Sequence, residues 1–214
     1  MCAQLFFHQV FSFSAQIYDE QIEVLNHVGQ SMSTKRVVIC GVARTPIGSF
    51  MGTLSSISAV DLGIMAVKEL CSRVGFDASS GIVDDVYFGQ VLQAGSGQNP
   101  ARQVTLGAGL PITTSASTIN KVCGSSLEAA MLAANSILAG KSKVVIAGGM
   151  ESMSNAPQLL MGQRKGKKMG DSKLIDSMIH DGLWDVYNDI HTVSYTHLRA
   201  HETVLDLVCR LLLE

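Results

Sequence analysis

The chain has 214 residues, of which 47% are hydrophobic and 16% are charged, and its formal net charge is −2. This composition is typical of a globular protein long enough to bury a core, and the nearly neutral balance argues against a surface that binds nucleic acid. No apolar run is long enough to span a membrane, and the five cysteines, odd in number and widely spaced, favour a reducing compartment over a disulfide framework or a zinc site.

The first 34 residues contain no Lys or Arg but include three acidic residues. A transit peptide is Arg-rich and poor in acids, so this segment does not match one. Residues 5–15 suit the apolar core of a signal peptide, but the positively charged segment that should precede such a core is missing. We therefore predict that residues 1–34 are a disordered extension, or upstream sequence translated ahead of a start at Met32.

The elements that follow alternate between strands and helices. Short β-type runs predict strands at residues 37–39, 84–92, 114–119 and 143–147. Ser58 opens a capping box before a helix that stops at Gly75, and Asn99 followed by Pro100 opens a second helix that ends near Gly109. This alternation predicts an α/β fold with a mainly parallel sheet covered on both faces.

Cys123 follows the strand predicted at residues 114–119 and precedes a nearly all-apolar helix that closes at Gly140. The unpaired N–H groups and the positive dipole end of a helix stabilise an anion at such a corner. For a cysteine that anion is the thiolate, which is the nucleophilic form. Cys123 is therefore a candidate for covalent catalysis, and the alternative is a buried structural cysteine. A second polar turn, at residues 148–154, falls at another strand end, where sites in open α/β sheets lie.

From Asn155 the character of the chain changes. Residues 161–171 are basic and glycine-rich, which predicts a loop, and a short amphipathic piece follows at residues 174–179. The cations of the loop suit a phosphate-bearing ligand, but most such runs are solvated surface. The glycine-rich stretch at residues 93–98 lacks the Gly-Lys-Ser/Thr of a phosphate-binding loop, so it receives no such role.

Several blocks of the sequence, taken together and in order, resemble the thiolase family. They are ARTPIGSF at 43–50, GQNPARQ at 97–103, GAGLP at 107–111, NKVCGS at 120–125, GGMESMS at 148–154 and DGLWDVYN at 181–188. The resemblance runs from about Lys35 to His191 and is closest to the acetyl-CoA acetyltransferase branch. It implies the layered αβαβα thiolase fold, of which this chain would hold most of the N-terminal half.

The resemblance also implies a division of the chain. Residues 35–154 would form the N-terminal domain with the nucleophile, and residues 155–191 would open a truncated CoA-binding loop domain. The basic loop would correspond to a cationic loop near the tetramer interface and the CoA end. Residues 192–214 look foreign to the protein, because the match stops after His191.

By the same resemblance, Cys123 would be the acylated nucleophile, with its backbone N–H in an oxyanion hole, and Leu183 and His191 would line the CoA site. The implied reaction condenses two acetyl-CoA to acetoacetyl-CoA, or cleaves acetoacetyl-CoA with CoA. CoA thioesters are then substrates, and no prosthetic group or metal is expected. The full-length protein would be a cytoplasmic homodimer or homotetramer, with the mitochondrion as the alternative compartment and with no nucleic acid or membrane as partner.

Two departures from the family pattern matter. Ser126 stands where the family usually has glycine, at the first turn of the nucleophile helix: a Cβ and hydroxyl there have the bulk to crowd the pocket, although a helical position tolerates serine. A second catalytic cysteine and the histidine of a Gly-His-Pro motif would come after His191, and the reaction needs them, so the chain as written is expected to show no turnover. His197 and His201 are spaced like zinc ligands on a helix but lack further ligands, so no metal site is expected there.

Two other interpretations remain open. The chain could be a non-catalytic fragment or interaction module that docks on a thiolase-like partner, because unfilled core and strand edges favour association. Within the same superfamily, a longer-chain 3-ketoacyl-CoA thiolase is also compatible with the stretch between Lys35 and His191.

Overall fold

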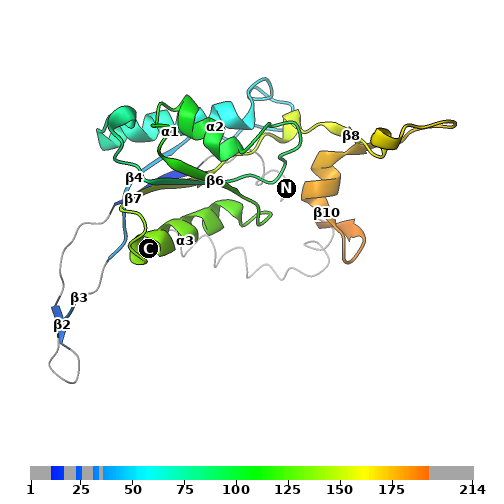
Figure 1. Cartoon of the computed structure of the whole chain (residues 1–214). Coiled ribbons are helices and arrows are strands. Elements are labelled where there is room, and N and C mark those ends of the chain that lie inside the picture. The colour runs from blue at the N-terminus through cyan, green and yellow to red at the C-terminus, as the bar shows by residue number, and fades with distance from the viewer. Residues whose placement is uncertain (1–10, 17–22, 26–30, 34–35, 193–214) are drawn as a thin grey trace. The chain divides into compact units, whose positions relative to one another are not determined.

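The structure, a computed structural model, describes residues 11–16, 23–25, 31–33 and 36–192 (Figure 1). These residues form two compact units, and the boundary between them falls between Ala156 and Pro157. The sequence predicted a change of character at Asn155. In the described part of the chain, no helix combines the length and the apolar character needed to cross a membrane.

A five-stranded sheet is the centre of the first unit. Its strands in chain order are β1 (Phe11–Gln16), β4 (Val38–Arg44), β5 (Asp85–Gly89), β6 (Ser115–Ile119) and β7 (Val144–Gly149). They are ordered β4-β1-β7-β5-β6 across the sheet. β5 is parallel to β6 and β7, whereas β1 runs antiparallel to β4 and β7. Four of the five strands thus run in one direction, as the predicted mainly parallel sheet requires, whereas β1, inserted between β4 and β7, runs against them.

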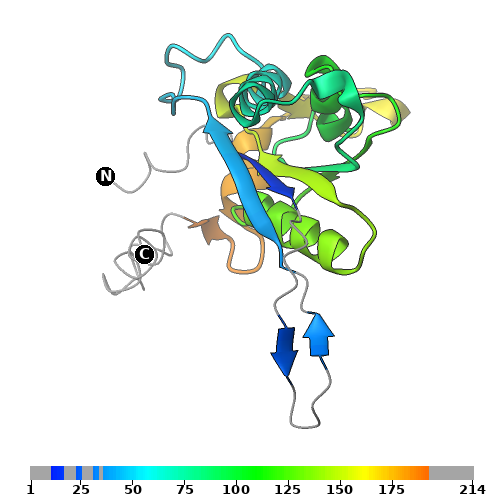
Figure 2. The ribbon, with the colours of Figure 1, turned by 90° about the vertical axis from the view of Figure 1, so that its left-hand side faces the viewer.

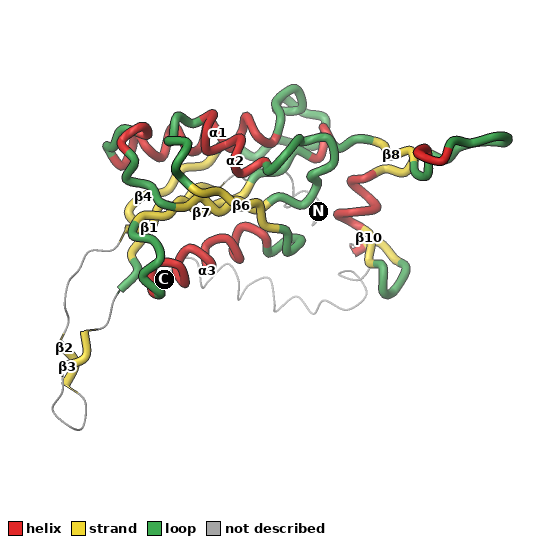
Figure 3. Tube along the Cα trace, in the orientation of Figure 1, coloured by secondary structure: helices red, strands yellow, loops and turns green. Residues whose placement is uncertain are grey.

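Three helices cover this sheet. α1 (Ala59–Val74) and α2 (Pro100–Gly107) lie on one face, and α3 (Ser125–Leu138) lies on the other, as Figures 1 and 3 show. Figure 2 looks onto the edge where β4 lies beside β1. Helices on both faces of the sheet give the predicted α/β fold.

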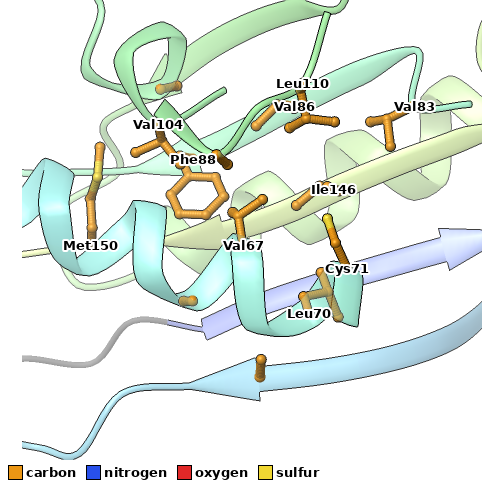
Figure 4. Packing of buried hydrophobic residues seen from close by; sticks show 14 of the residues in the cluster. Val67, Leu70, Cys71, Val83, Val86, Phe88, Val104, Leu110, Ile146 and Met150 are labelled. Carbon is orange, nitrogen blue, oxygen red and sulfur yellow. The ribbon is translucent and has the colours of Figure 1, made fainter. Parts of the chain in front are cut away.

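Hydrophobic residues fill both spaces between helices and sheet, because alternate residues of a strand point to opposite faces. Val144 and Ile146 of β7 belong to the cluster under α1 and α2, whereas Val145 and Ala147 belong to the cluster under α3. In Figure 4, Phe88 of β5 lies among residues of α1 and α2. The ends of β5 and β7 are thus fixed by packing on both faces.

The ends of α1 and α2 follow the local signals in the sequence. The hydroxyl of Ser58 accepts a backbone N–H of the first turn of α1 at 3.1 Å, and Gly75 ends that helix with φ +82°. The side chain of Asn99 accepts a backbone N–H of α2 at 3.3 Å, and Pro100 is the first residue of that helix. These predictions are confirmed, and they succeed because a cap depends on residues close in sequence.

Within its described residues, 157–192, the second unit contains two small hairpins and the segment that joins them. β8 (Gln158–Leu160) pairs with β9 (Leu174–Asp176), and β10 (Trp184–Asp185) pairs with β11 (Ile190–His191). The predicted basic loop joins β8 to β9 and contains a 3₁₀ turn, η4 (Gln163–Lys165). A single π-helical segment, η5 (Met178–Leu183), connects β9 to β10.

Residues 1–34 differ from the expectation of disorder in three places. β1 is central to the sheet, and β2 (Glu23–Leu25) pairs with β3 (Ser31–Ser33). The sequence of β1, FSFSAQ, alternates apolar and polar residues as strands do. The alternative, that residues 1–31 are upstream sequence, stays a prediction. His197 and His201 lie outside the described residues, as does all of the expected foreign tail except Thr192.

β4 is longer than the sequence indicated. The run at residues 37–39 predicted only a short strand. The structure extends β4 to Arg44, and Ala43 and Arg44 pair with β1. Pairing with β1 therefore carries the strand beyond the apolar run, and β4 ends before Pro46 and Gly48.

Candidate active site

Cys123 lies in the short connection between β6 and α3. β6 ends at Ile119 and α3 begins at Ser125, so the cysteine precedes the helix by two residues. Its side chain is exposed. The structure thus places an accessible thiol at the amino-terminal end of the helix, where the sequence predicted it.

Side-chain hydrogen bonds shape this connection, which we call the Cys123 elbow (residues 120–125). The carboxamide oxygen of Asn120 accepts the backbone N–H of Val122 at 3.0 Å. The hydroxyl of Ser125 accepts the backbone N–H of Lys121 at 2.8 Å and donates to the carbonyl of Val122 at 2.6 Å. Ser125 is buried, and its hydroxyl joins the backbone of Lys121 to that of Val122 within the elbow.

Val122, directly before the cysteine, has a strained backbone. Its φ is +49°, in the left-handed region, which is a rare conformation for a β-branched residue. Such a conformation costs on the order of 1–3 kcal/mol and persists only where surrounding contacts impose it. The hydrogen bonds from Asn120 and Ser125 on either side of Val122 are the contacts that impose it here.

The first turn of α3 rests on two glycines at the ends of neighbouring strands. A Cβ at Gly89, the last residue of β5, would lie 2.6 Å from the carbonyl carbon of Ser125 and 2.7 Å from the backbone nitrogen of Ser126. A Cβ at Gly149, the last residue of β7, would overlap the hydroxyl of Ser126. The two glycines therefore set how closely the start of the nucleophile helix approaches the sheet.

Ser126 has a different environment from the one expected. The sequence suggested that its side chain would crowd the pocket. In the structure its hydroxyl lies against Gly149, on the side of α3 that faces the sheet. The serine in place of the usual glycine therefore fills space between helix and strand.

Glu151 joins the ends of β5 and β7. Its carboxylate accepts the backbone N–H of Val91 at 2.8 Å and that of Leu92 at 3.2 Å. Burial raises the pKa of this carboxyl, and the hydrogen bonds from Val91 and Leu92 oppose that rise. Sequence reasoning assigned Glu151 no individual role, although it lies in the GGMESMS block.

The raised pKa of Glu151 predicts a pH dependence of stability. Between its ordinary value of 4.5 and its higher value in the folded protein, the folded state holds more protons than the unfolded state. The free energy of unfolding therefore falls as pH rises through this window and levels off above it. Denaturant unfolding at a series of pH values should show this fall in the wild type and a flatter profile in Glu151→Gln. Parallel profiles for the two proteins would contradict the prediction.

Removing the Ser125 hydroxyl should destabilise the elbow. Ser125→Ala leaves the Lys121 N–H without its side-chain acceptor and removes one of the two hydrogen bonds to the Val122 carbonyl, and a donor shielded from water without a partner costs about 1–3 kcal/mol. Ser126→Ala is the matched control, because its hydroxyl forms no hydrogen bond with the described residues, and a change within about 0.5 kcal/mol is expected. Denaturant unfolding measures both, and equal effects of the two variants would contradict the role of Ser125.

The residues expected to line a CoA site, Leu183 and His191, lie in the second unit. His191 is in β11, and its ring packs edge-on against Trp184 of β10 with the ring centroids 5.1 Å apart. Leu183 ends η5, and its carbonyl accepts the hydroxyl of Thr192 at 3.1 Å. The structure brings these two residues together around one hairpin. Cys123 belongs to the other unit.

Sequence reasoning did not single out Asn120, Ser125, Glu151 or the two glycines. Asn120 carried a usable signal, because Asn after a strand often bonds a backbone N–H two residues on. Gly149 also carried one, since glycine at a strand end often marks a close approach of backbones. Ser125 and Glu151 act through contacts formed by folding.

The comparisons with known proteins agree on one family. A family model described as thiolase, N-terminal domain, matches residues 37–204. The chain is 56% identical over 155 residues to an acetyl-CoA acetyltransferase of Cupriavidus necator. The aligned stretch covers 72% of this chain and 39% of the relative. It is 54% identical over 157 residues to a probable acetyl-CoA acetyltransferase of Escherichia coli. This aligned stretch covers 73% of the chain and 39% of the relative.

Acetyl-CoA acetyltransferase 2 of Arabidopsis thaliana is 48% identical over 176 residues, which covers 82% of this chain and 43% of the relative. Other relatives carry the words cytosolic or mitochondrial in their names. The chain belongs to the thiolase family. It spans about two fifths of the length of the curated relatives it matches.

Proposed function

We propose that the complete protein is an acetyl-CoA acetyltransferase in which Cys123 carries the acyl group. One observation supports this role most directly: an exposed thiol lies in a strained elbow immediately before α3. The names of the relatives support acetyl-CoA as the substrate. The alternative of a structural cysteine is disfavoured, because the side chain of a structural cysteine is normally buried.

In the first half-reaction, the Cys123 thiolate attacks the carbonyl carbon of acetyl-CoA. A bond from carbon to Sγ forms, the bond from carbon to the sulfur of CoA breaks, and the departing CoA thiolate takes up a proton. Negative charge develops on the carbonyl oxygen during the attack. The N–H groups of Gly124 and Ser125 already bond to the carbonyls of Lys121 and Val122 at 3.0 and 3.1 Å. We therefore assign the oxyanion to the N–H of Cys123.

In the second half-reaction, a base removes a proton from the α-carbon of a second acetyl-CoA. The resulting carbanion attacks the acyl carbon, the bond to Sγ breaks, and Cys123 regains a proton, which yields acetoacetyl-CoA and leaves the enzyme ready for another cycle. The reverse sequence cleaves acetoacetyl-CoA with CoA. We assign no described residue to the base of this step.

We propose CoA thioesters as substrates, with Leu183 and His191 contributing to the CoA site and no prosthetic group taking part. The shared hairpin of these two residues supports a common role. Lys167 of the basic loop and Lys173, which follows the loop, lie beside an open hollow of about 350 Å³, and their exposed charges suit the phosphates of CoA.

We also propose that the complete protein is a homodimer or homotetramer in the cytoplasm, with the mitochondrion as the alternative. Three exposed apolar residues on α3, Leu127, Met131 and Leu138, support association. Relatives named for either compartment support both locations.

Acetyl transfer to the protein tests the role of Cys123 and requires only the first half-reaction. The chain is incubated with acetyl-CoA, digested, and searched by mass spectrometry for an acetylated cysteine. We expect the acetyl group on Cys123. An unmodified Cys123 whose thiol is still alkylated by iodoacetamide would overturn the proposal, because the thiol would then be accessible but inert toward the thioester.

A further inference from the structure

Glu151 is a partly buried charged group that the proposed chemistry does not use. Burying a carboxylate is unfavourable unless hydrogen bonds compensate, and here the backbone N–H groups of Val91 and Leu92 compensate for part of that cost. Val91 and Leu92 follow β5, whereas Glu151 follows β7. The carboxylate therefore links two segments that lie about sixty residues apart in the sequence.

The same two segments hold the glycines under the nucleophile helix. Gly89 lies two residues before Val91, and Gly149 lies two residues before Glu151. A backbone hydrogen bond from the N–H of Met150 to the carbonyl of Gly89, 2.9 Å long, joins the segments just before the Glu151 link. The side chain of Met150 is buried in the cluster shown in Figure 4, so the chain next to Glu151 is anchored on the core.

The approach of α3 depends on these strand ends. The backbone of Ser125 and Ser126 lies so close to Gly89 that even a methyl group would not fit between them. The hydroxyl of Ser126 lies closer still to the position of a Cβ added at Gly149. A shift of either strand end must therefore move the first turn of α3, and the elbow that holds Cys123 would move with it.

We propose that Glu151 is a positioning residue for the nucleophile: it holds the ends of β5 and β7 together so that Gly89 and Gly149 seat the first turn of α3 and, with it, the elbow that carries Cys123. The inference rests on the proposed function, because it concerns how well the helix end supports the reactive thiolate. Glu151 itself touches neither Cys123 nor a substrate in this scheme.

A carboxylate suits this position better than an amide does. Two N–H donors converge on Glu151, and a carboxylate offers two acceptor oxygens. In Glu151→Gln one oxygen remains as an acceptor, but the NH₂ group faces a donor. In Glu151→Ala both backbone N–H groups lose their partner. The link between the two strand ends should therefore weaken in steps, from the wild type through Glu151→Gln to Glu151→Ala.

The test measures thiol reactivity one cysteine at a time in the full chain. Iodoacetamide alkylation is followed by peptide mass spectrometry in the wild type, Glu151→Ala and Glu151→Gln. Cys71 is the internal reference, because it is buried in the core and burial raises the pKa of its thiol, so its alkylation reports opening of the fold. Glu69→Ala, which removes an exposed carboxylate of α1, is the matched control.

We expect Glu151→Ala to slow alkylation of Cys123 by about twofold to fivefold, the range that a helix end supplies to an exposed anion. Glu151→Gln should fall between Glu151→Ala and the wild type, Glu69→Ala should match the wild type, and Cys71 should stay protected in all four proteins. An unchanged rate at Cys123 in Glu151→Ala would overturn the proposal. So would alkylation of Cys71 that rises in step, because Glu151 would then only hold the fold together.

If Glu151→Ala does not fold, the alkylation rates of Cys123 and Cys71 in Glu151→Gln test the proposal instead. The outcome is separable from the proposed function. Acetylation of Cys123 in the wild type with unchanged alkylation in the Glu151 variants rejects positioning alone. Failure of acetylation in the wild type rejects the acyl-carrier role, whatever the variants show.

Discussion

Replacing Cys123 by serine is expected to abolish acetyl transfer from acetyl-CoA to the protein. At neutral pH a serine hydroxyl is not ionised and is a weak nucleophile, whereas a thiol is partly thiolate and intrinsically nucleophilic. Loss of a catalytic nucleophile lowers an acyl-transfer rate on the order of 10³-fold or more. Peptide mass spectrometry of the Cys123→Ser variant after incubation with acetyl-CoA should therefore find no acetyl group on the peptide that contains the substituted position.

The fold should survive this change, because the side chain of Cys123 is exposed and serine is nearly the same size. Denaturant unfolding should place Cys123→Ser within about 0.5 kcal/mol of the wild type. Cys40→Ser is the matched control in the same unit and should retain acetylation of Cys123. If the Cys123→Ser protein is still acetylated at the wild-type rate on some other residue, the transfer does not depend on the Cys123 thiol.

The outline of the first unit was predictable because its signals are local. The predicted strands at residues 84–92, 114–119 and 143–147 correspond to β5, β6 and β7, and the caps of α1 and α2 are set by residues within one helical turn. β1 was not predicted, because a short alternating run in a segment without other order signals does not say which strands it will join. Its partners, β4 and β7, are separated by about one hundred residues.

The candidate site was predictable only at its reactive atom. Cys123 could be recognised because it stands between a strand and an apolar helix. The interactions that hold it depend on tertiary structure: Ser125 becomes a bridge because the elbow folds over it, and Glu151 becomes a link because β5 and β7 are neighbours. Ser126 illustrates the limit well, since its position in the helix was evident but the direction of its side chain, toward Gly149, was not.

Methyl groups added at the two glycines should have large effects that differ in kind. Gly89→Ala places a Cβ 2.6–2.7 Å from backbone and Cβ atoms of Ser125 and Ser126, which cannot move without shifting α3. A loss of about 3 kcal/mol or more in the free energy of unfolding is expected, at the upper end of overpacking in a core. Gly149→Ala collides mainly with the hydroxyl of Ser126, so a loss of about 1–3 kcal/mol is expected.

A second substitution separates the two mechanisms. Ser126→Gly removes the colliding hydroxyl and should recover most of the stability that Gly149→Ala loses, after its own helix-propensity cost of about 1 kcal/mol is subtracted. It should recover little for Gly89→Ala, because that collision also involves backbone atoms. Gly124→Ala is the control at the start of the same helix, since a Cβ there meets its nearest backbone atom at an ordinary 3.4 Å.

Double-mutant cycles from denaturant unfolding measure both couplings. If Ser126→Gly rescues both glycine variants equally, the hydroxyl explains both collisions and the backbone of α3 is free to yield. If it rescues only Gly149→Ala, the start of the nucleophile helix is held by backbone contact with β5, and Ser126 adds a second, adjustable contact with β7. The second outcome is expected, because a Cβ at Gly89 would lie within 2.7 Å of backbone atoms of α3, whereas the severe overlap at Gly149 is with the hydroxyl of Ser126 alone.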